Sequence, residues 1–362
     1  MNTPLFIRRD IQQGFSLIEM MIAITIGLLL LAGLGTVYLG SRQTFRQQEA
    51  LARMQEGARY AFEVMTLELR QAGYRGCAPK NNTYSSLAVS VPPDWFNDLA
   101  TRPLVGYESG AGLPAVVTGG LANTDAVSVL RADEAGDFRV AVNGHTPPSS
   151  AVITLNKNHG LNVGEILTAV SADCSYAATF QMTAAPSTVK VQHNSGSGTP
   201  GNSTKCLSDP ASVPCASPPT YPPLQDNSKI MRTRGTIYYL ANNATSGQPS
   251  LFREILSTSG GAAASVAEEL IEGVENMQIL YGEDTSAPTD RNIDQYVAAN
   301  AVTNWDNVLA VRISLLMRSV ENSVVNQPQA VAFNGATVNS GVGADRRLRK
   351  VFTTTIAVRN RL

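Results

Sequence analysis

The hydrophobic and polar positions divide the chain into a short leader, an apolar run and a long mixed region. Fourteen largely polar residues precede an apolar run from Phe15 to Leu39, in which Glu19 is the only charged residue. At about 1.5 Å per residue, a helix of this length measures roughly 37 Å, and a hydrocarbon core measures roughly 30 Å. The pattern therefore predicts a membrane-spanning helix over 15–40, preceded by a leader over 1–14.

The next segment, 41–75, repeats its apolar residues at the period of an α-helix. From Leu51 onward the apolar residues are separated by steps of three or four, with charged side chains between them. Gly73 is a helix-stop signal, and glycines 33, 35 and 40 are positions where the helix could bend or melt locally. We predict one continuous helix whose second half packs on the following domain. The predicted packing face consists of Phe45, Leu51, Met54, Ala58, Phe62, Met65, Leu69 and Ala72.

Residues 76–362 are predicted to form a β-rich domain, because short apolar runs alternate there with turn-forming sequence. The segment 268–281 fits a helix or a strand, and its Val and Ile content together with Gly273 favours a strand. The predicted strands are Leu87–Val91, Ala126–Arg131, Phe138–Val142, Ala151–Leu155, Glu165–Val170, Ala177–Thr183, Thr236–Ala241, Leu251–Leu256, Val274–Tyr281, Val308–Met317 and Lys350–Val358.

A stretch at about 184–227 interrupts the series of strands. Eight of the 19 prolines fall there, a density that argues against a regular strand or helix through most of it. It is either a linker between domains or a long surface insertion. Two stacked antiparallel sheets behind one long helix fit the pattern better than two independent domains. The expected fold class is therefore α+β, with the insertion inside a single β-rich domain.

Composition and charge exclude several classes of protein. Hydrophobic residues make up 43% and charged residues 16% of the chain, a balance opposite to that of disordered proteins. The net charge is -1, whereas nucleic-acid binders carry an excess or a cluster of positive charge. Arg346, Arg347, Arg349 and Lys350 form one such cluster, which we interpret as a charged strand flank rather than a DNA contact. No nucleic-acid partner is expected.

Motifs for catalysis or for a cofactor are missing from the sequence. There is no HExxH, GxSxG, P-loop or dinucleotide fingerprint, so we expect neither an enzyme nor a cofactor. The acidic run 133–137 could ligate calcium, although a solvated turn is the simpler interpretation. The three histidines, His145, His159 and His193, have no spacing typical of metal ligands, and no zinc site is expected.

The four cysteines allow three pairings. In an oxidising compartment we expect two disulfides. Cys206 and Cys215 lie nine residues apart in the proline-rich stretch, so that a local bridge would staple it. Cys77 would then join Cys174 and tie the end of the helix to a strand. A disulfide that closes a loop of roughly 100 residues could stabilise the fold by about 4–5 kcal/mol in the entropic model.

The start of the apolar run carries the most specific signal. A charged side chain in a spanning helix costs about 2.5–3.5 kcal/mol at the membrane centre, so Glu19 requires a partner. If the chain is cut after Gly14, the new amine is on Phe15, about one turn from Glu19, and this amine or that of a neighbouring helix is the obvious partner. A secretory signal peptide would instead end its apolar run at a small-residue cleavage site, and none follows here.

The residues GFSLIEMMIAITIGLLLLAG resemble the signal of type IV pilins and of the pseudopilins of type II secretion. The resemblance implies that a prepilin peptidase cleaves after Gly14 and that Phe15 becomes N-methylated. It also implies that Glu19 neutralises the N-terminal amine of an adjacent subunit during assembly. Three further blocks resemble the PilW family of minor pilins: 58–77, 164–183 and the C-terminal RRLRKVFTTTIAVRNRL.

This resemblance implies an assembly subunit. Arg8 and Arg9 predict a cytoplasmic N-terminus, and the family places the C-terminal domain in the periplasm and the mature subunit in the inner membrane, then in the pilus at the cell surface. The implied partners are other minor pilins, the major pilin, the prepilin peptidase, the inner-membrane assembly platform and a tip adhesin. The implied roles are priming of pilus assembly, a place in or near the tip, twitching motility and adhesion.

Two alternatives remain open at this point. A J-type minor pseudopilin of type II secretion would share every physical feature above and would serve protein secretion. A membrane-anchored periplasmic binding module or adhesin that never polymerises would share the anchor, but it would have no use for the carboxylate of Glu19.

Overall fold

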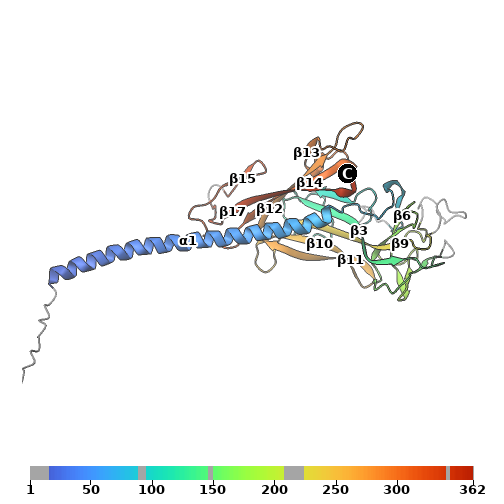
Figure 1. Ribbon diagram of the computed structural model, residues 1–362, viewed down its shortest axis with the longest axis horizontal. Helices are drawn as coiled ribbons and strands as arrows, with labels where there is room; N and C mark the ends of the chain where they lie inside the picture. The colour runs from blue at the N-terminus through green and yellow to red at the C-terminus, as the bar shows by residue number, and fades with distance from the viewer. Residues whose placement is uncertain (1–15, 89–94, 146–149, 208–223, 340–342, 362) are drawn as a thin grey trace, which may run out of the picture.

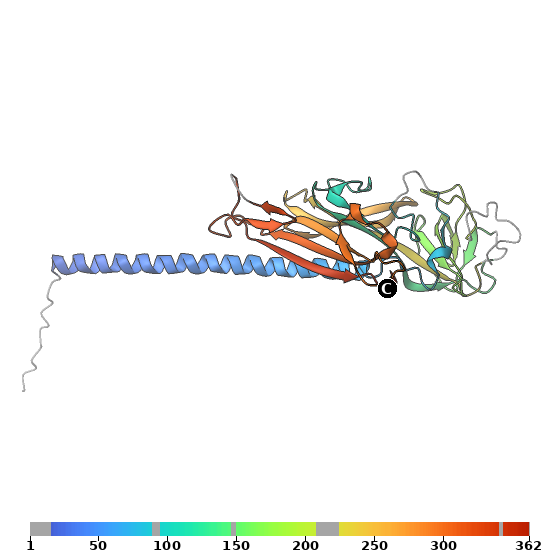
Figure 2. The same ribbon diagram turned by 90° about the horizontal axis from the view of Figure 1, so that it is seen from above.

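One long helix carries a β-rich domain at its C-terminal end (Figures 1 and 2). The computed structural model describes residues 16–88, 95–145, 150–207, 224–339 and 343–361. Helix α1 (Leu17–Leu69) is continuous over 53 residues, and the three glycines at 33, 35 and 40 do not interrupt it. Its first half projects away from the domain, and its second half lies against the strands.

The largest sheet of the described residues has eight strands. Long strand β9 is its centre: β3 pairs along one side of it, and β5 and β10 share the other side. The β1–β6 ladder is parallel, and the other ladders of this sheet are antiparallel. The strands are β1 (Thr83–Ser85), β2 (Leu104–Tyr107), β3 (Ala126–Arg139), β5 (Ile166–Val170), β6 (Ala177–Gln181), β9 (Lys229–Asn242), β10 (Pro249–Ser259) and β11 (Ala262–Glu272).

A second, four-stranded antiparallel sheet has the order β13-β12-β14-β17. Two small sheets complete the domain: the hairpin β15–β16, and a distal sheet with the order β4-β8-β7. The strands are β12 (Val274–Glu283), β13 (Gln295–Val297), β14 (Val308–Arg318), β17 (Arg349–Ala357), β15 (Val331–Phe333), β16 (Ala336–Val338), β4 (Val152–Thr154), β7 (Ala184–Ser187) and β8 (Lys190–Gln192). Five short 3-10 helices are η1 (Lys80–Asn82), η2 (Glu108–Gly110), η3 (Ala299–Ala301), η4 (Trp305–Asn307) and η5 (Arg359–Arg361).

The main hydrophobic core lies between α1 and the sheets. The buried residues of the helix are Ala50, Met54, Ala58, Ala61, Met65 and Leu69. All of them except Ala50 pack in one core cluster with residues of β3, β9, β12 and β14. Alanines at three of these positions, and Gly57 beside them, let the helix backbone come close to the sheet. A Cβ on Gly57 would lie 3.4 Å from Cε of Met317 in β14.

The end of α1 is closed by residues from the far end of the chain. The amide of Arg359 donates to the carbonyl of Arg70 (3.1 Å). The side-chain amide of Asn360 donates to the carbonyls of Gln71 (3.2 Å) and Ala72 (3.3 Å). These bonds satisfy carbonyls that lack a partner within the helix.

The predicted α+β class, with one long N-terminal helix on a strand-rich domain, is confirmed. The prediction of two stacked sheets is wrong, because the described residues form four sheets. The predicted packing face is partly wrong: Phe45 is 64% exposed, and Ala50 and Ala61 are buried in the face instead. The helix ends at Leu69, four residues before the glycine predicted to stop it, and Gly73 follows in a turn at φ +75°.

Each predicted strand between 126 and 358 overlaps a strand of the structure, although several bounds differ and 138–142 shares only its first two residues with β3. The segment 268–281 forms two strands, β11 and β12, which separate at Gly273. Strand β3 runs through 126–139 with a break in register between Asp133 and Phe138. In the predicted strand at 87–91, Leu87 makes a single bridge to Asn202, and the residues from 89 lie outside the described part.

The proline-rich stretch at 184–227 holds more regular structure than its composition predicts. Strands β7 and β8 form at its beginning and pair with each other, and β8 also pairs with β4. Residues 208–223, which contain six of its prolines, lie outside the described residues. Pro186 lies within β7, where the ladder with β8 shifts register between Ala184 and Ser187, and the other seven prolines of the stretch follow β8.

Candidate assembly helix and its surroundings

The first half of α1 is an apolar cylinder that the domain leaves uncovered. Its large side chains from Leu17 to Leu39 are each more than half exposed, with Leu17 at 78% and Leu29 at 74%. It is the one helix among the described residues that is long and apolar enough to cross a membrane, with a mean hydropathy of 2.4. A contiguous apolar surface of this size marks a contact with lipid or with another protein.

Glu19 lies in the first turn of this helix, where the structure places it in a capping box. The amide of Ser16 donates to Oε2 of Glu19 (3.0 Å), and the amide of Ile18 donates to Oγ of Ser16 (3.4 Å). The carboxylate therefore lies at the positive end of the helix dipole, which favours a negative charge. The predicted cleavage residues Gly14 and Phe15 lie outside the described residues.

The outer face of the second half of α1 carries a row of exposed acidic and apolar side chains. Glu49, Glu56 and Glu63 follow one another at seven-residue steps, so they lie on one face of the helix. Phe45 and Leu67 lie on the same face and are 64% and 61% exposed. We refer to these five residues as the outer row. It is a second surface on which the helix can meet a neighbour.

Segment 319–325, which follows β14, crosses α1 just beyond the uncovered half. The side-chain amide of Gln43 donates to the carbonyl of Val324. Arg53 donates to Glu321 (3.3 Å) and, within the helix, to Glu49 (2.7 Å). This contact could not be predicted from the sequence, because no pattern in 319–325 relates the segment to helix residues some 280 positions earlier.

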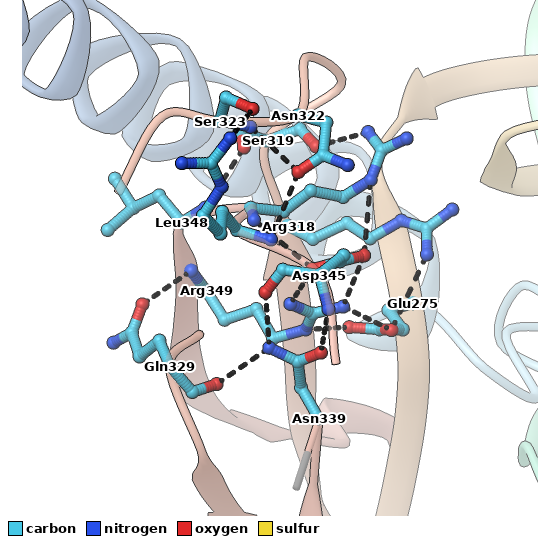
Figure 3. A network of polar contacts seen from close by, with 12 residues as sticks. Glu275, Arg318, Ser319, Asn322, Ser323, Gln329, Asn339, Asp345, Leu348 and Arg349 are labelled. Carbon is cyan, nitrogen blue, oxygen red and sulfur yellow. Dashed lines mark hydrogen bonds and ion pairs between the residues drawn. The ribbon is translucent and has the colours of Figure 1, made fainter. Parts of the chain in front are cut away.

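A network of polar contacts holds this segment in place (Figure 3). Arg349, whose side chain is 2% exposed, pairs with Glu275 (2.7 Å) and Asp345 (2.6 Å). Arg318 lies 3.5 Å from Glu275. The hydrogen bond from Arg349 is the main cause that lowers the pKa of Asp345. Two acidic and two basic side chains thus join β12, β14 and β17 at the root of the segment.

Most basic side chains of the cluster at 346–350 form contacts within this network. Arg347 pairs with Asp345 (3.3 Å) and donates to the carbonyl of Ser319 (3.0 Å). Arg346 donates to Oγ of Ser323 (2.8 Å). Arg349 is buried, and Lys350 lies over the ring of Phe352 at 5.6 Å. The interpretation as a charged strand flank fits these contacts, and a contiguous basic surface for DNA does not.

The structure contains a disulfide between Cys77 and Cys174, 97 residues apart in sequence. It links the segment after α1 to the turn between β5 and β6, whereas the sequence led us to expect a link from the end of the helix to a strand. Cys206 is also disulfide-bonded, and its expected partner Cys215 lies outside the described residues.

The acidic run 133–137 is neutralised by basic side chains of the same domain. Asp133 pairs with Arg234 (3.1 Å) and Glu134 with Lys229 (3.1 Å). Asp137 pairs with Arg139 (3.0 Å). Across the described ranges, no group of three or more His, Cys, Asp and Glu side chains could hold a metal ion.

All three histidines lie buried in the distal part of the domain. His159 accepts from the amide of Leu161 (2.9 Å), and His145 donates to the carbonyl of Ser150 (3.0 Å). Neither ring nitrogen of His193 has a hydrogen-bond partner within the described part of the chain. Its ring packs against Phe180 and His145, with centroids 5.2 and 5.9 Å away.

Protonation of His193 opposes folding, and this gives a testable pH dependence. Burial, and secondarily the neighbouring His145, lower the pKa of His193 to about 3. Between pH 6.5 and about 3 the unfolded chain binds a proton here that the folded chain does not. The free energy of unfolding should therefore fall by up to about 1.4 kcal/mol per pH unit as the pH drops through this window. We expect urea unfolding of His193→Leu to lose this part of the slope; an unchanged slope would contradict the assignment.

Comparison with known proteins gives two family matches. Residues 237–360 match the model of the type IV pilus-assembly protein W family, and residues 9–35 match the prokaryotic N-terminal methylation motif. The chain is PilW-like. The resemblance noted in the sequence is thereby confirmed. The PilW match runs from within β9 to η5, and so includes β11, β14 and β17, which contact α1.

The remaining comparisons add little to this assignment. A type IV-like pilin from Thermus thermophilus aligns with a TM-score of 0.21 and 19% sequence identity, over 36% of this chain and 68% of that one. A comparison with curated protein sequences gives no significant match. The methylation motif and the single apolar helix together fit a membrane-anchored, single-pass pilin.

Proposed function

We propose that this PilW-like chain is a non-catalytic minor pilin that helps to prime type IV pilus assembly and is incorporated in or near the pilus tip. The main observation in support of the proposal is the uncovered apolar half of α1, which starts inside the methylation motif. The same helix continues into a second half that packs on the domain. Such a helix suits two environments in turn, a bilayer and the helical core of a fibre, because both present apolar surface to it.

The proposed sequence of events follows from the positions on this helix. The precursor inserts with its leader in the cytoplasm and its domain in the periplasm, and is cut between Gly14 and Phe15. Removal of the leader frees an amine close to the carboxylate of Glu19. In the membrane the helix then associates laterally with those of other minor pilins and the major pilin, and the inner-membrane platform moves the complex into the fibre.

The shape of the domain supports a place at the tip. The part of the domain that contains the small sheet β4-β8-β7, which we call the distal lobe, extends beyond the C-terminal end of α1. It lies on the side opposite to the free half of the helix (Figures 1 and 2). In a fibre built on parallel helices, this lobe would extend past the layer of its own subunit. A terminal position accommodates such a lobe without a clash, and leaves it available for an adhesin or for a surface. Roles in twitching motility and adhesion would follow from this place.

The test is intact-mass and N-terminal analysis of the membrane-extracted protein, from cells with and without prepilin peptidase. We expect a mature chain that begins with N-methylated Phe15 only when the peptidase is present. A chain that still begins at Met1, or one cut after the apolar run, would overturn the pilin pathway. Co-purification with pilus subunits or with secretion pseudopilins then separates a pilus subunit from its J-type relative.

A further inference from the structure

A polar groove opens between α1 and segment 319–325, next to the uncovered half of the helix. Its volume is about 390 Å³. The helix side and the segment side are held together by the contacts of Gln43 with Val324 and of Arg53 with Glu321. The groove is lined by Arg46, Glu49, Ala50, Arg53, Glu321, Asn322, Ser323 and Val324.

The groove lies at the height of the lipid headgroups when the apolar half spans a bilayer. Arg42 and Arg46 are three and seven residues past Leu39, about 5 and 10 Å along the helix axis. The headgroup layer is about 5–8 Å thick on each side. Helical side chains point back toward the N-terminus, so both guanidinium groups reach toward the membrane. Tyr38 and Phe45, each 64% exposed, flank them as interfacial aromatic residues do.

The arginine side chains in and beside the groove differ in whether they form ion pairs, and the unpaired ones lie nearest the membrane. Arg42 and Arg46 are exposed and form no ion pair with any described residue. Arg53, farther along the helix, is paired with the carboxylates of Glu49 and Glu321. The end of the groove that faces the bilayer therefore has unneutralised positive charge, and the opposite end does not.

The segment side of the groove is fixed in position rather than free. Arg346 donates to Oγ of Ser323 through its guanidinium group (2.8 Å) and to Oδ1 of Asn322 through its backbone amide (3.0 Å). Asn322 and Ser323 lie in the same network as the ion pairs of Arg349 with Glu275 and Asp345 (Figure 3). This wall lines the groove together with Arg46, and Arg42 lies one helical turn nearer the membrane. Neutral donors and acceptors beside free arginines suit an anionic, hydrogen-bonding ligand.

We propose that this groove holds the headgroup of an anionic phospholipid while the subunit waits in the membrane. The proposal rests on the membrane-anchored state proposed above and adds the lipid class to it. Arg42 and Arg46 bind the phosphate, and the wall at Asn322 and Ser323 receives the remainder of the headgroup. The bound lipid fixes the rotation of the helix, and so presents the outer row sideways to a neighbouring subunit.

The test uses the full chain, extracted in detergent and offered equal amounts of phosphatidylglycerol and phosphatidylcholine. Native mass spectrometry counts the retained lipids. We expect the protein to retain phosphatidylglycerol preferentially, and each of R42Q and R46Q to reduce that preference about five-fold. The matched control is Arg59→Gln, which removes the same charge from an exposed site of the same helix about 20 Å farther along. We expect R59Q to behave as the wild type and Glu321→Gln to increase the preference.

Two results would overturn the lipid site: no preference in the wild type, or equal losses in R46Q and R59Q. Thermal unfolding of each variant shows that the fold is retained, because all four positions are on the surface. Failure of the proposed function would be seen separately. A chain that is never processed at Phe15 but still selects phosphatidylglycerol would support the lipid site and contradict the pilin pathway. A chain that is processed at Phe15 but shows no preference for phosphatidylglycerol would support the pilin pathway and contradict the lipid site.

Discussion

Replacing Glu19 by Gln should reduce incorporation of this subunit into pili by at least ten-fold and leave its insertion and folding unchanged. An amide oxygen still accepts the hydrogen bond from Ser16, so the substitution keeps the cap and removes only the charge. The carboxylate costs about 2.5–3.5 kcal/mol in hydrocarbon unless it is paired. An amine placed beside the carboxylate by a neighbouring subunit would offset that cost. A ten-fold loss of incorporation corresponds to about 1.4 kcal/mol, which is less than the cost that the pairing offsets. The measurement is the amount of subunit in sheared fibres relative to that in membranes.

The matched control is Ser16→Ala, which removes the side-chain cap and keeps the charge. Loss of an N-cap costs about 1 kcal/mol of helix stability, and the bilayer stabilises the rest of the helix. We therefore expect S16A to assemble nearly as well as the wild type. If E19Q assembles normally, the carboxylate serves only as a cap, and a non-polymerising anchored module becomes the better description. If both variants fail equally, the start of the helix matters through its conformation rather than its charge.

Replacing Arg349 by Met should cost about 3–5 kcal/mol of unfolding free energy, the range found when one partner of a buried ion pair is removed. The guanidinium group forms four contacts, at 2.6–3.2 Å, with the carboxylates of Glu275 and Asp345. Without it, two partly buried carboxylates lose their main partner. Chemical unfolding of the full chain in detergent measures the loss. Hydrogen exchange should also rise in segment 319–325, because the network fixes its root.

The control for this prediction is Lys350→Ala, one residue away on the same strand and exposed. We expect it to change the free energy of unfolding by less than about 0.5 kcal/mol. The triple variant R349M/E275Q/D345N removes all three charges and should recover part of the loss, since no carboxylate is then left unpaired. Equal effects of R349M and K350A would show that the network contributes little and that segment 319–325 is held by other contacts.

The sequence determines the helix and its signal well, because both depend on local patterns. The apolar run, the three-and-four spacing and the position of Glu19 require no knowledge of distant residues. The strands were found for a similar reason, since alternation within β14 and β17 is visible in a few residues. Bounds and sheet membership were less predictable. Gly273 separates β11 from β12 through a positive φ of +84°, and the sequence shows only that a glycine is present.

The contacts that shape the candidate site could not have been predicted in this way. Arg349 appears in sequence as one of several neighbouring basic residues, and its partner Glu275 is 74 positions earlier. Glu321 and Val324 meet α1 across more than 260 residues. In the sequence His193 is one of three scattered histidines, and its burial beside His145, without a hydrogen-bond partner among the described residues, depends on the packing of the distal lobe. Charge and spacing identify candidates, and tertiary structure decides which of them remain available.

The bonds from Arg359 and Asn360 to residues 70–72 have a consequence for how the protein is made. The helix is synthesised first, yet the residues that close its end, and the edge strand β17 beside it, are synthesised last. The domain therefore cannot reach its native state while the ribosome is still adding these residues. The end of α1 therefore gains these partners only after the chain is complete, through contacts that span almost 290 residues, and contacts of such long range form slowly.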